Sequence, residues 1–168
     1  MAEITFKGHI IHTCGHLPSL QTRAHDFVLI DRDLHERGLG QWRGKKKIIA
    51  TVPSLDTSTC STMTKHLNEL AKKHPDLMIL VVSADLPFAQ KRFCEAEDVH
   101  NVLTLSMMRD KKFGEDYGLL ILEGPLSGLL ARSVILLDEK DHVLYMELVP
   151  ELTHEPDYSK ILAALKHQ

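Results

Sequence analysis

Apolar residues gather in two continuous runs of strand length, residues 48–52 (IIATV) and 77–83 (LMILVVS). Runs without polar alternation are typical of strands that are covered on both faces of a sheet. Between these runs, apolar residues recur at helical spacing, at Met63, Leu67, Leu70 and Ala71. Pro75 then closes the helical segment. The order predicts a strand–helix–strand unit with parallel strands and a right-handed crossover.

The rest of the chain supplies shorter strands and two more helices. The expected strands are 4–14, as a hairpin turning at Lys7-Gly8, then 26–33, 101–106, 132–138 and 142–149. The expected helices are 87–97 and 156–167. This order predicts an α/β, thioredoxin-like fold: a central mixed β-sheet flanked by helices, with an N-terminal β-hairpin extension. No segment has the composition of a linker or a repeat, so residues 1–168 are expected to form a single domain.

Composition narrows the function classes. The chain is 43% apolar and 26% charged with a net charge of −3, which argues against nucleic-acid binding. Its one basic run, Lys45-Lys46-Lys47, is expected to be a solvated loop. The longest apolar run is too short to span a membrane, and no signal peptide is apparent. Three widely spaced cysteines are not a secreted disulfide framework, so we expect a cytoplasmic protein whose thiols are catalytic.

Cys60 closes the segment PSLDTSTC (53–60), between the first buried strand and the helix that follows it. Thr57 or Ser58 suits the N-cap, which places Cys60 in the first helical turn. The free N–H groups and positive dipole end of that turn favour thiolate over thiol. The alternative is a structural cysteine, since a buried free thiol commonly behaves as a small apolar residue.

Dithiol enzymes of the thioredoxin fold carry C-x-x-C at this turn, and here Thr57 takes the place of the first cysteine. Disulfide exchange within one turn is therefore excluded. A hydroxyl beside a thiolate suits attack on an O–O bond, which needs a deprotonated sulfur, hydrogen-bond donors and positive charge for the departing oxygen. The product of that attack is a sulfenic acid, which another thiol must resolve.

The pattern P-x-x-x-T-x-x-C, formed by Pro53, Thr57 and Cys60, resembles the active-site signature of peroxiredoxins. The chain is most similar to the thiol peroxidases, the atypical two-cysteine branch. Residues 83–94 (SADLPFAQKRFC) resemble that branch's segment with the resolving cysteine. Residues 124–139 resemble its segment with the active-site arginine. The resemblance covers nearly the whole chain.

The resemblance implies a role for each matching residue. Cys60 is expected to be the peroxidatic nucleophile, with Thr57 bonding sulfur and peroxide and Arg132 stabilising the thiolate and polarising the O–O bond. Pro53 is expected to shield the sulfur from water. Cys94 is expected to form an intramolecular disulfide with Cys60 that thioredoxin reduces, and the family's usual form is a homodimer. Hydrogen peroxide and organic hydroperoxides are the implied substrates, with no cofactor.

Each assignment has an alternative from packing alone. Cys94 lies near phenylalanines, and the alternative is that it is only a packed thiol. The alternative for Arg132 is a surface arginine at the start of a strand. The apolar run that follows it makes an unpaired guanidinium costly there. Thr57 and Pro53 also suit a plain N-cap and a strand terminator. At the level of function, the alternative is a peroxide sensor that passes the Cys60–Cys94 disulfide to a partner protein.

His12, Cys14 and His16 alternate along the N-terminal hairpin, which would place them on one face of a strand. Such a face is a possible soft-metal site. No fourth ligand is evident, and alternate residues share a face in any strand. A solvated or packed strand face is the favoured interpretation, and no bound metal is expected.

Overall fold

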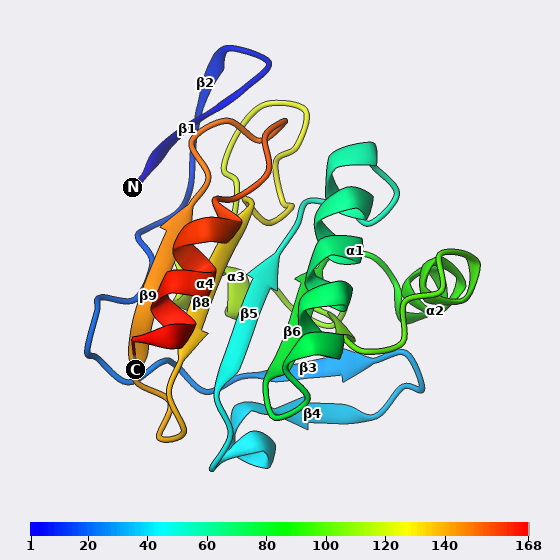
Figure 1. The fold of residues 1–168 in the computed structure, drawn as a ribbon. Helices are drawn as coiled ribbons and strands as arrows, with labels where there is room; N and C mark the ends of the chain where they lie inside the picture. The colour runs from blue at the N-terminus through cyan, green and yellow to red at the C-terminus, as the bar shows by residue number, and fades with distance from the viewer. Residues whose placement is uncertain (168) are drawn as a thin grey trace.

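The computed structural model describes residues 1–167 of the chain, and within them a seven-stranded mixed sheet forms the centre of the molecule (Figure 1). The strand order is β4-β3-β7-β6-β5-β8-β9. The strands are β3 Val28–Asp31, β4 Glu36–Gly38, β5 Lys47–Thr51, β6 Met78–Ser83, β7 Leu103–Ser106, β8 Ser133–Leu137 and β9 Val143–Leu148. The predicted central mixed sheet is confirmed.

Helices lie on both faces of this sheet. They are α1 Ser58–Lys73, α2 Pro87–Ala96, α3 Lys112–Asp116 and α4 Tyr158–Lys166, with a short 3₁₀ turn η1 at Leu39–Trp42. In Figure 1, α1 and α4 cover the near face, and α3 lies behind the sheet. Because β5 and β6 are parallel and joined by α1, the predicted strand–helix–strand unit is confirmed.

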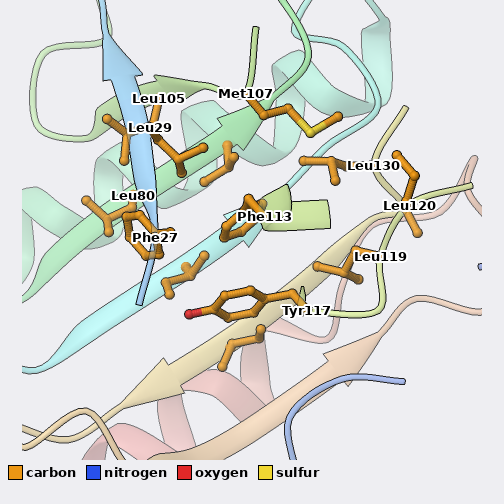
Figure 2. Close-up of a cluster of buried hydrophobic side chains, with 14 of the residues drawn as sticks. Phe27, Leu29, Leu80, Leu105, Met107, Phe113, Tyr117, Leu119, Leu120 and Leu130 are labelled. Atoms are coloured by element: carbon orange, nitrogen blue, oxygen red, sulfur yellow. The ribbon is translucent and has the colours of Figure 1, made fainter. Parts of the chain in front are cut away.

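The sequence of β5 lacks polar alternation because all five residues of the strand are buried. Successive side chains point to opposite faces, so Ile48 and Ala50 join the core beneath α1 while Ile49 joins the core on the other face. Figure 2 shows that second core, where Phe27, Phe113 and Tyr117 pack together. A sheet buried on both sides fixes the end of β5, where the loop to α1 begins.

The predicted N-terminal hairpin is also present, as β1 Glu3–Phe6 and β2 His9–His12. Lys7 and Gly8 form its two-residue turn with φ angles of 51° and 80°. Turns of this kind need positive φ at both positions, which glycine adopts without cost. The hairpin forms a separate two-stranded sheet and meets the body of the protein at a bridge between Thr5 and Glu151.

Two elements escape the sequence pattern. Strand β4 has three mostly polar residues, and α3 has five residues, so neither is long enough to show a hydrophobic period. They are held by tertiary partners: β4 pairs with β3, and Phe113 of α3 is buried in the core of Figure 2.

The expectation of a solvated basic loop is wrong for Lys47. Its side chain is fully buried at the start of β5, and its Nζ lies 2.6 Å from Oδ1 of the equally buried Asp141. A buried ammonium group is tolerated when a carboxylate pairs with it. The partner stands in the β8–β9 turn, so the local run of lysines gives no sign of it.

Candidate active site

Cys60 lies in the first turn of α1, at the end of the loop that follows β5, and its side chain is fully buried. Thr57 occupies the N-cap position with extended backbone, as predicted. Its hydroxyl does not cap the helix; it donates to the carbonyl of Ser54 at 3.1 Å. The N–H groups of the first turn therefore receive no side-chain cap from Thr57, and their positive potential acts on the region of the sulfur.

Arg132 brings its guanidinium to the same sulfur. Nη1 and Nη2 each lie 3.4 Å from Cys60 Sγ. The side chain is 1% exposed, and its nitrogens also donate to the carbonyl of Leu152, Nη2 at 2.7 Å and Nε at 3.3 Å. Arg132 is therefore held from two sides, by a thiol and by a backbone carbonyl.

The sheet register explains this meeting of residues that are far apart in sequence. Strands β5 and β8 are antiparallel, and Thr51 at the end of β5 stands opposite Ser133 at the start of β8. Arg132, which directly precedes Ser133, and the loop that leads from Thr51 to Cys60 consequently lie at the same end of the sheet.

The surroundings of Arg132 favour an anionic sulfur. Among residues 1–167, no carboxylate forms an ion pair with this buried guanidinium. A buried cation without an anionic partner carries a large desolvation cost, and negative charge at the position of Cys60 Sγ, 3.4 Å from Nη1, would offset it. The bidentate approach of two N–H groups also leaves a donor array beside the sulfur that suits a developing negative charge on an attacked oxygen.

Pro53 is buried at the beginning of the loop, and Asp85 fixes the residues after it. The Asp85 carboxylate accepts hydrogen bonds from the Ser54 hydroxyl at 2.7 Å, the Leu55 N–H at 2.8 Å and the Ser83 hydroxyl at 2.7 Å. The loop that carries Cys60 is thereby tied to the junction between β6 and α2. Sequence reasoning gave Asp85 no role; its one signal is an aspartate two residues before a proline that opens a helix.

Replacing Asp85 with alanine is expected to lower the free energy of unfolding by about 2 kcal/mol, because three donors lose one partly buried carboxylate. Urea unfolding measures this change. Asp56→Ala is the matched control in the same loop, since Asp56 is exposed and is expected to change stability by less than about 0.5 kcal/mol. Equal effects of the two substitutions would contradict the anchoring role of Asp85.

Cys94 is also fully buried, on the face of α2 that packs against the sheet. Burial raises the pKa of its thiol, and Thr104 Oγ1 lies 3.9 Å from its sulfur. All three cysteines are free, and Cys60 and Cys94 belong to the same hydrophobic core. The packed thiol is therefore the observed state of Cys94, which makes it a neutral, sheltered group rather than a second thiolate.

The candidate metal ligands of the hairpin do not come together. Strand β2 ends at His12, whose Nδ1 pairs with Glu123. Cys14 Sγ donates to the carbonyl of Gly114, and the ring of His16 lies beside the N-terminal amine. Within residues 1–167, no group of three or more His, Cys, Asp or Glu side chains is arranged to hold a metal ion. The chain leaves the regular strand after His12, so the predicted common face is wrong.

Comparisons with known proteins identify the family of the chain. The Redoxin family profile matches residues 20–162. The thiol peroxidase of Leptospira interrogans is 46% identical over 166 residues, covering 98% of this chain and 97% of the relative. The thiol peroxidase of Mycobacterium bovis is 46% identical over 165 residues, covering 98% of this chain and 99% of the relative.

Solved structures give the same picture. A peroxiredoxin-like protein from Aquifex aeolicus superposes with a TM-score of 0.92 at 40% identity, over 99% of this chain and 96% of its own. A thiol peroxidase from Chromobacterium violaceum superposes with a TM-score of 0.92 at 25% identity, over 98% of this chain and 95% of its own. The predicted thioredoxin-like fold is confirmed, and the chain belongs to the thiol peroxidase family of the peroxiredoxins.

Proposed function

We propose that this thiol peroxidase reduces hydrogen peroxide and organic hydroperoxides through Cys60, and that Cys94 and thioredoxin complete the cycle. The observation that carries the proposal is the pair of guanidinium nitrogens of Arg132, both 3.4 Å from Cys60 Sγ at a helix start. A sulfur in that setting is a nucleophile, and the donors beside it suit a peroxide.

In the first step the Cys60 thiolate attacks the terminal oxygen of the hydroperoxide. An S–O bond forms as the O–O bond breaks, and the leaving alkoxide or hydroxide takes a proton to become an alcohol or water. Sulfur is oxidised by two electrons to the sulfenic acid, and the peroxide is reduced by the same two. Arg132 stabilises the thiolate and then the negative charge on the leaving oxygen.

Thr57 and Pro53 shape the place where the peroxide binds. The Thr57 hydroxyl is exposed and stands one helical turn before Cys60, and it must exchange its bond to the Ser54 carbonyl for one to the substrate. Pro53 is buried beside the sulfur's loop and has no N–H to hydrate, so it limits access of water. Both residues favour peroxide over bulk water at the sulfur.

In the second step the Cys94 sulfur attacks Cys60–SOH. An S–S bond forms, the S–O bond breaks, and water leaves with the thiol proton. Thioredoxin then supplies two electrons and two protons to restore both thiols. A cavity of about 430 Å³ between the Cys60 loop and α2, lined in part by Ser54, Asp85 and Phe93, gives α2 room to move as Cys94 leaves its buried site.

Assembly and location are part of the same proposal. Leu86 and Phe88 are 54% and 65% exposed at the start of α2, beside the Asp85 contact, and apolar side chains in that position suit a second copy of the chain. Sedimentation velocity of the protein and of Phe88→Asp tests the homodimer, which the variant should weaken. Three free thiols suit the reducing cytoplasm. Among the described residues, no helix has the length and apolarity needed to cross a membrane.

The test of this function is peptide mapping of the reduced protein after one equivalent of hydroperoxide. A peptide that links Cys60 to Cys94 is the expected product. If Cys60 is found as sulfinic acid while Cys94 is still free, the sulfenic acid is resolved by a thiol from another molecule and not by Cys94. A Cys60 that stays reduced would overturn the peroxidase mechanism.

A further inference from the structure

The loop after β9 connects the active-site arginine to the N-terminal hairpin. Leu152 in this loop is buried, and its carbonyl accepts from two nitrogens of Arg132, Nη2 at 2.7 Å and Nε at 3.3 Å. Because the other neighbours of the guanidinium are the sulfurs of Cys60 and Met63, this carbonyl is its strongest hydrogen-bond acceptor. The position of Leu152 therefore decides where the guanidinium points.

Strand β1 holds the backbone on both sides of Glu151. The N–H of Thr5 donates to the carbonyl of Pro150 at 2.7 Å, and the N–H of Leu152 donates to the carbonyl of Thr5 at 2.9 Å. These two bonds form a short parallel bridge between Thr5 and Glu151. The backbone that leads to the Leu152 carbonyl is thus hydrogen-bonded directly to strand β1 of the hairpin.

The side chain of Glu151 also binds the hairpin, through its carboxylate. Its Oε2 accepts from the Thr5 hydroxyl at 2.7 Å and the Gly8 N–H at 3.1 Å. Its Oε1 accepts from the Lys7 N–H at 3.0 Å, and from the Thr153 N–H and hydroxyl at 3.1 and 2.9 Å. Successive N–H groups in a positive-φ turn form a concave site for an anion, and here the anion is a side chain of the protein.

These hydrogen bonds, led by the one from the Thr5 hydroxyl, lower the pKa of Glu151 to about 2. The carboxylate is therefore charged at any pH where a thiolate exists, and all five donors remain bound. A neutral amide in its place would keep one accepting oxygen, but it would turn an NH2 group toward the donors that the other carboxylate oxygen now binds. The contact is built for a carboxylate and for no other group of that size.

We propose that Glu151 is a positioning residue for the peroxidase reaction, acting through Leu152 and Arg132. Its carboxylate fastens the β1–β2 turn to the loop 150–153, which fixes the Leu152 carbonyl and so holds the guanidinium against Cys60. The N-terminal hairpin thereby serves as a brace for the active site. The inference rests on the proposed roles of Cys60 and Arg132.

The test compares Glu151→Gln with Glu123→Gln. Both substitutions remove a carboxylate that contacts the hairpin, but Glu123 meets His12 at the end of β2 and has no connection to Leu152. Two rates are measured on the reduced full-length protein: single-turnover reaction with hydrogen peroxide, and alkylation of Cys60 by iodoacetamide across pH. Glu151→Gln is expected to slow both about ten-fold at neutral pH and to move the alkylation profile to higher pH, because a displaced donor stabilises charge less well. Glu123→Gln is expected to leave both unchanged.

A double-mutant cycle with Arg132→Lys distinguishes an action of Glu151 through the guanidinium from a general effect of Glu151 on protein stability. If Glu151 acts through the guanidinium, Glu151→Gln adds little to the effect of Arg132→Lys. The same ten-fold factor in both backgrounds, or no effect of Glu151→Gln in either, would overturn the proposal. If Glu151→Gln fails to fold, Thr5→Val removes one of the five bonds and should show the same changes at about two- to three-fold. Alkylation needs no peroxide chemistry, so it tests Glu151 even if the wild-type protein consumes no peroxide.

Discussion

Cys60→Ser is expected to lower the rate of peroxide consumption by roughly 10⁴-fold or more, since the reaction loses its proposed nucleophile. A serine hydroxyl occupies almost the same volume in the fully buried site. It remains protonated at neutral pH, so it cannot supply the electron pair that breaks an O–O bond. Arg132 keeps its bond to the Leu152 carbonyl, and its local structure should survive. The measurement is the loss of hydrogen peroxide with dithiothreitol as reductant, alongside circular dichroism to establish folding.

Cys14→Ser is the matched control for that experiment. Cys14 is half-buried, and its sulfur donates to the carbonyls of Gly114 and Glu115, away from Arg132. Its replacement should leave the rate within about two-fold of wild type, because none of the reacting groups contacts it. Turnover near the wild-type level in Cys60→Ser would show that another thiol carries the reaction, and the mechanism would fall.

The sequence predicts the central strands well, because their burial on both faces leaves a visible mark. Strand β5 has five buried residues in a row, and the helix after it places Cys60 and Met63 on one inward face. Those two features locate Cys60, the proposed nucleophile, at the start of a helix without any structural information. Strand β4 and helix α3 leave no such mark, since neighbouring elements rather than local periodicity hold them in place.

The environment of the nucleophile is harder to predict because much of it is backbone or comes from distant turns. Arg132 is identified only by resemblance, and its distance to Cys60 depends on the register of β5 against β8. The carbonyl of Leu152 carries no side-chain signal at all, yet it holds the guanidinium at 2.7 Å. Asp85 and Lys47 show the same limit, since their partners stand on other strands and loops.

These contacts give the site two separately anchored parts. Asp85 ties the Cys60 loop to the start of α2, and the hairpin with Glu151 holds the loop after β9, whose Leu152 carbonyl accepts from Arg132. In the proposed mechanism, the part that holds Arg132 needs no movement during attack on peroxide, whereas the part that holds the loop and α2 has to loosen for Cys94 to reach the sulfenic acid. The two proposed steps would thus depend on different hydrogen bonds.

Cys94→Ser should separate these two steps. The variant is expected to reduce one equivalent of peroxide within about two-fold of the wild-type rate, because the sulfur of Cys94 lies beside Thr104, whereas the proposed first step depends on the contact between Cys60 and Arg132. Its steady-state rate with thioredoxin should fall about 100-fold or more, since no disulfide forms for thioredoxin to reduce. Stopped-flow fluorescence measures the first quantity, and thioredoxin-coupled NADPH oxidation measures the second.

The fate of Cys60 in that variant completes the argument. Without a resolving thiol, the sulfenic acid persists, and excess peroxide should convert it to sulfinic acid. Mass spectrometry would then show the mass of two oxygen atoms added to the thiol form of the protein. Continued turnover with thioredoxin at the wild-type rate would instead assign resolution to another thiol and return Cys94 to the role of a packed core residue. A wild-type protein that forms the disulfide yet turns over only with one particular partner protein, and never with thioredoxin, would favour a peroxide sensor. Continuous turnover with thioredoxin that is lost in Cys94→Ser identifies a peroxidase, because a sensor needs the same disulfide but not its repeated reduction.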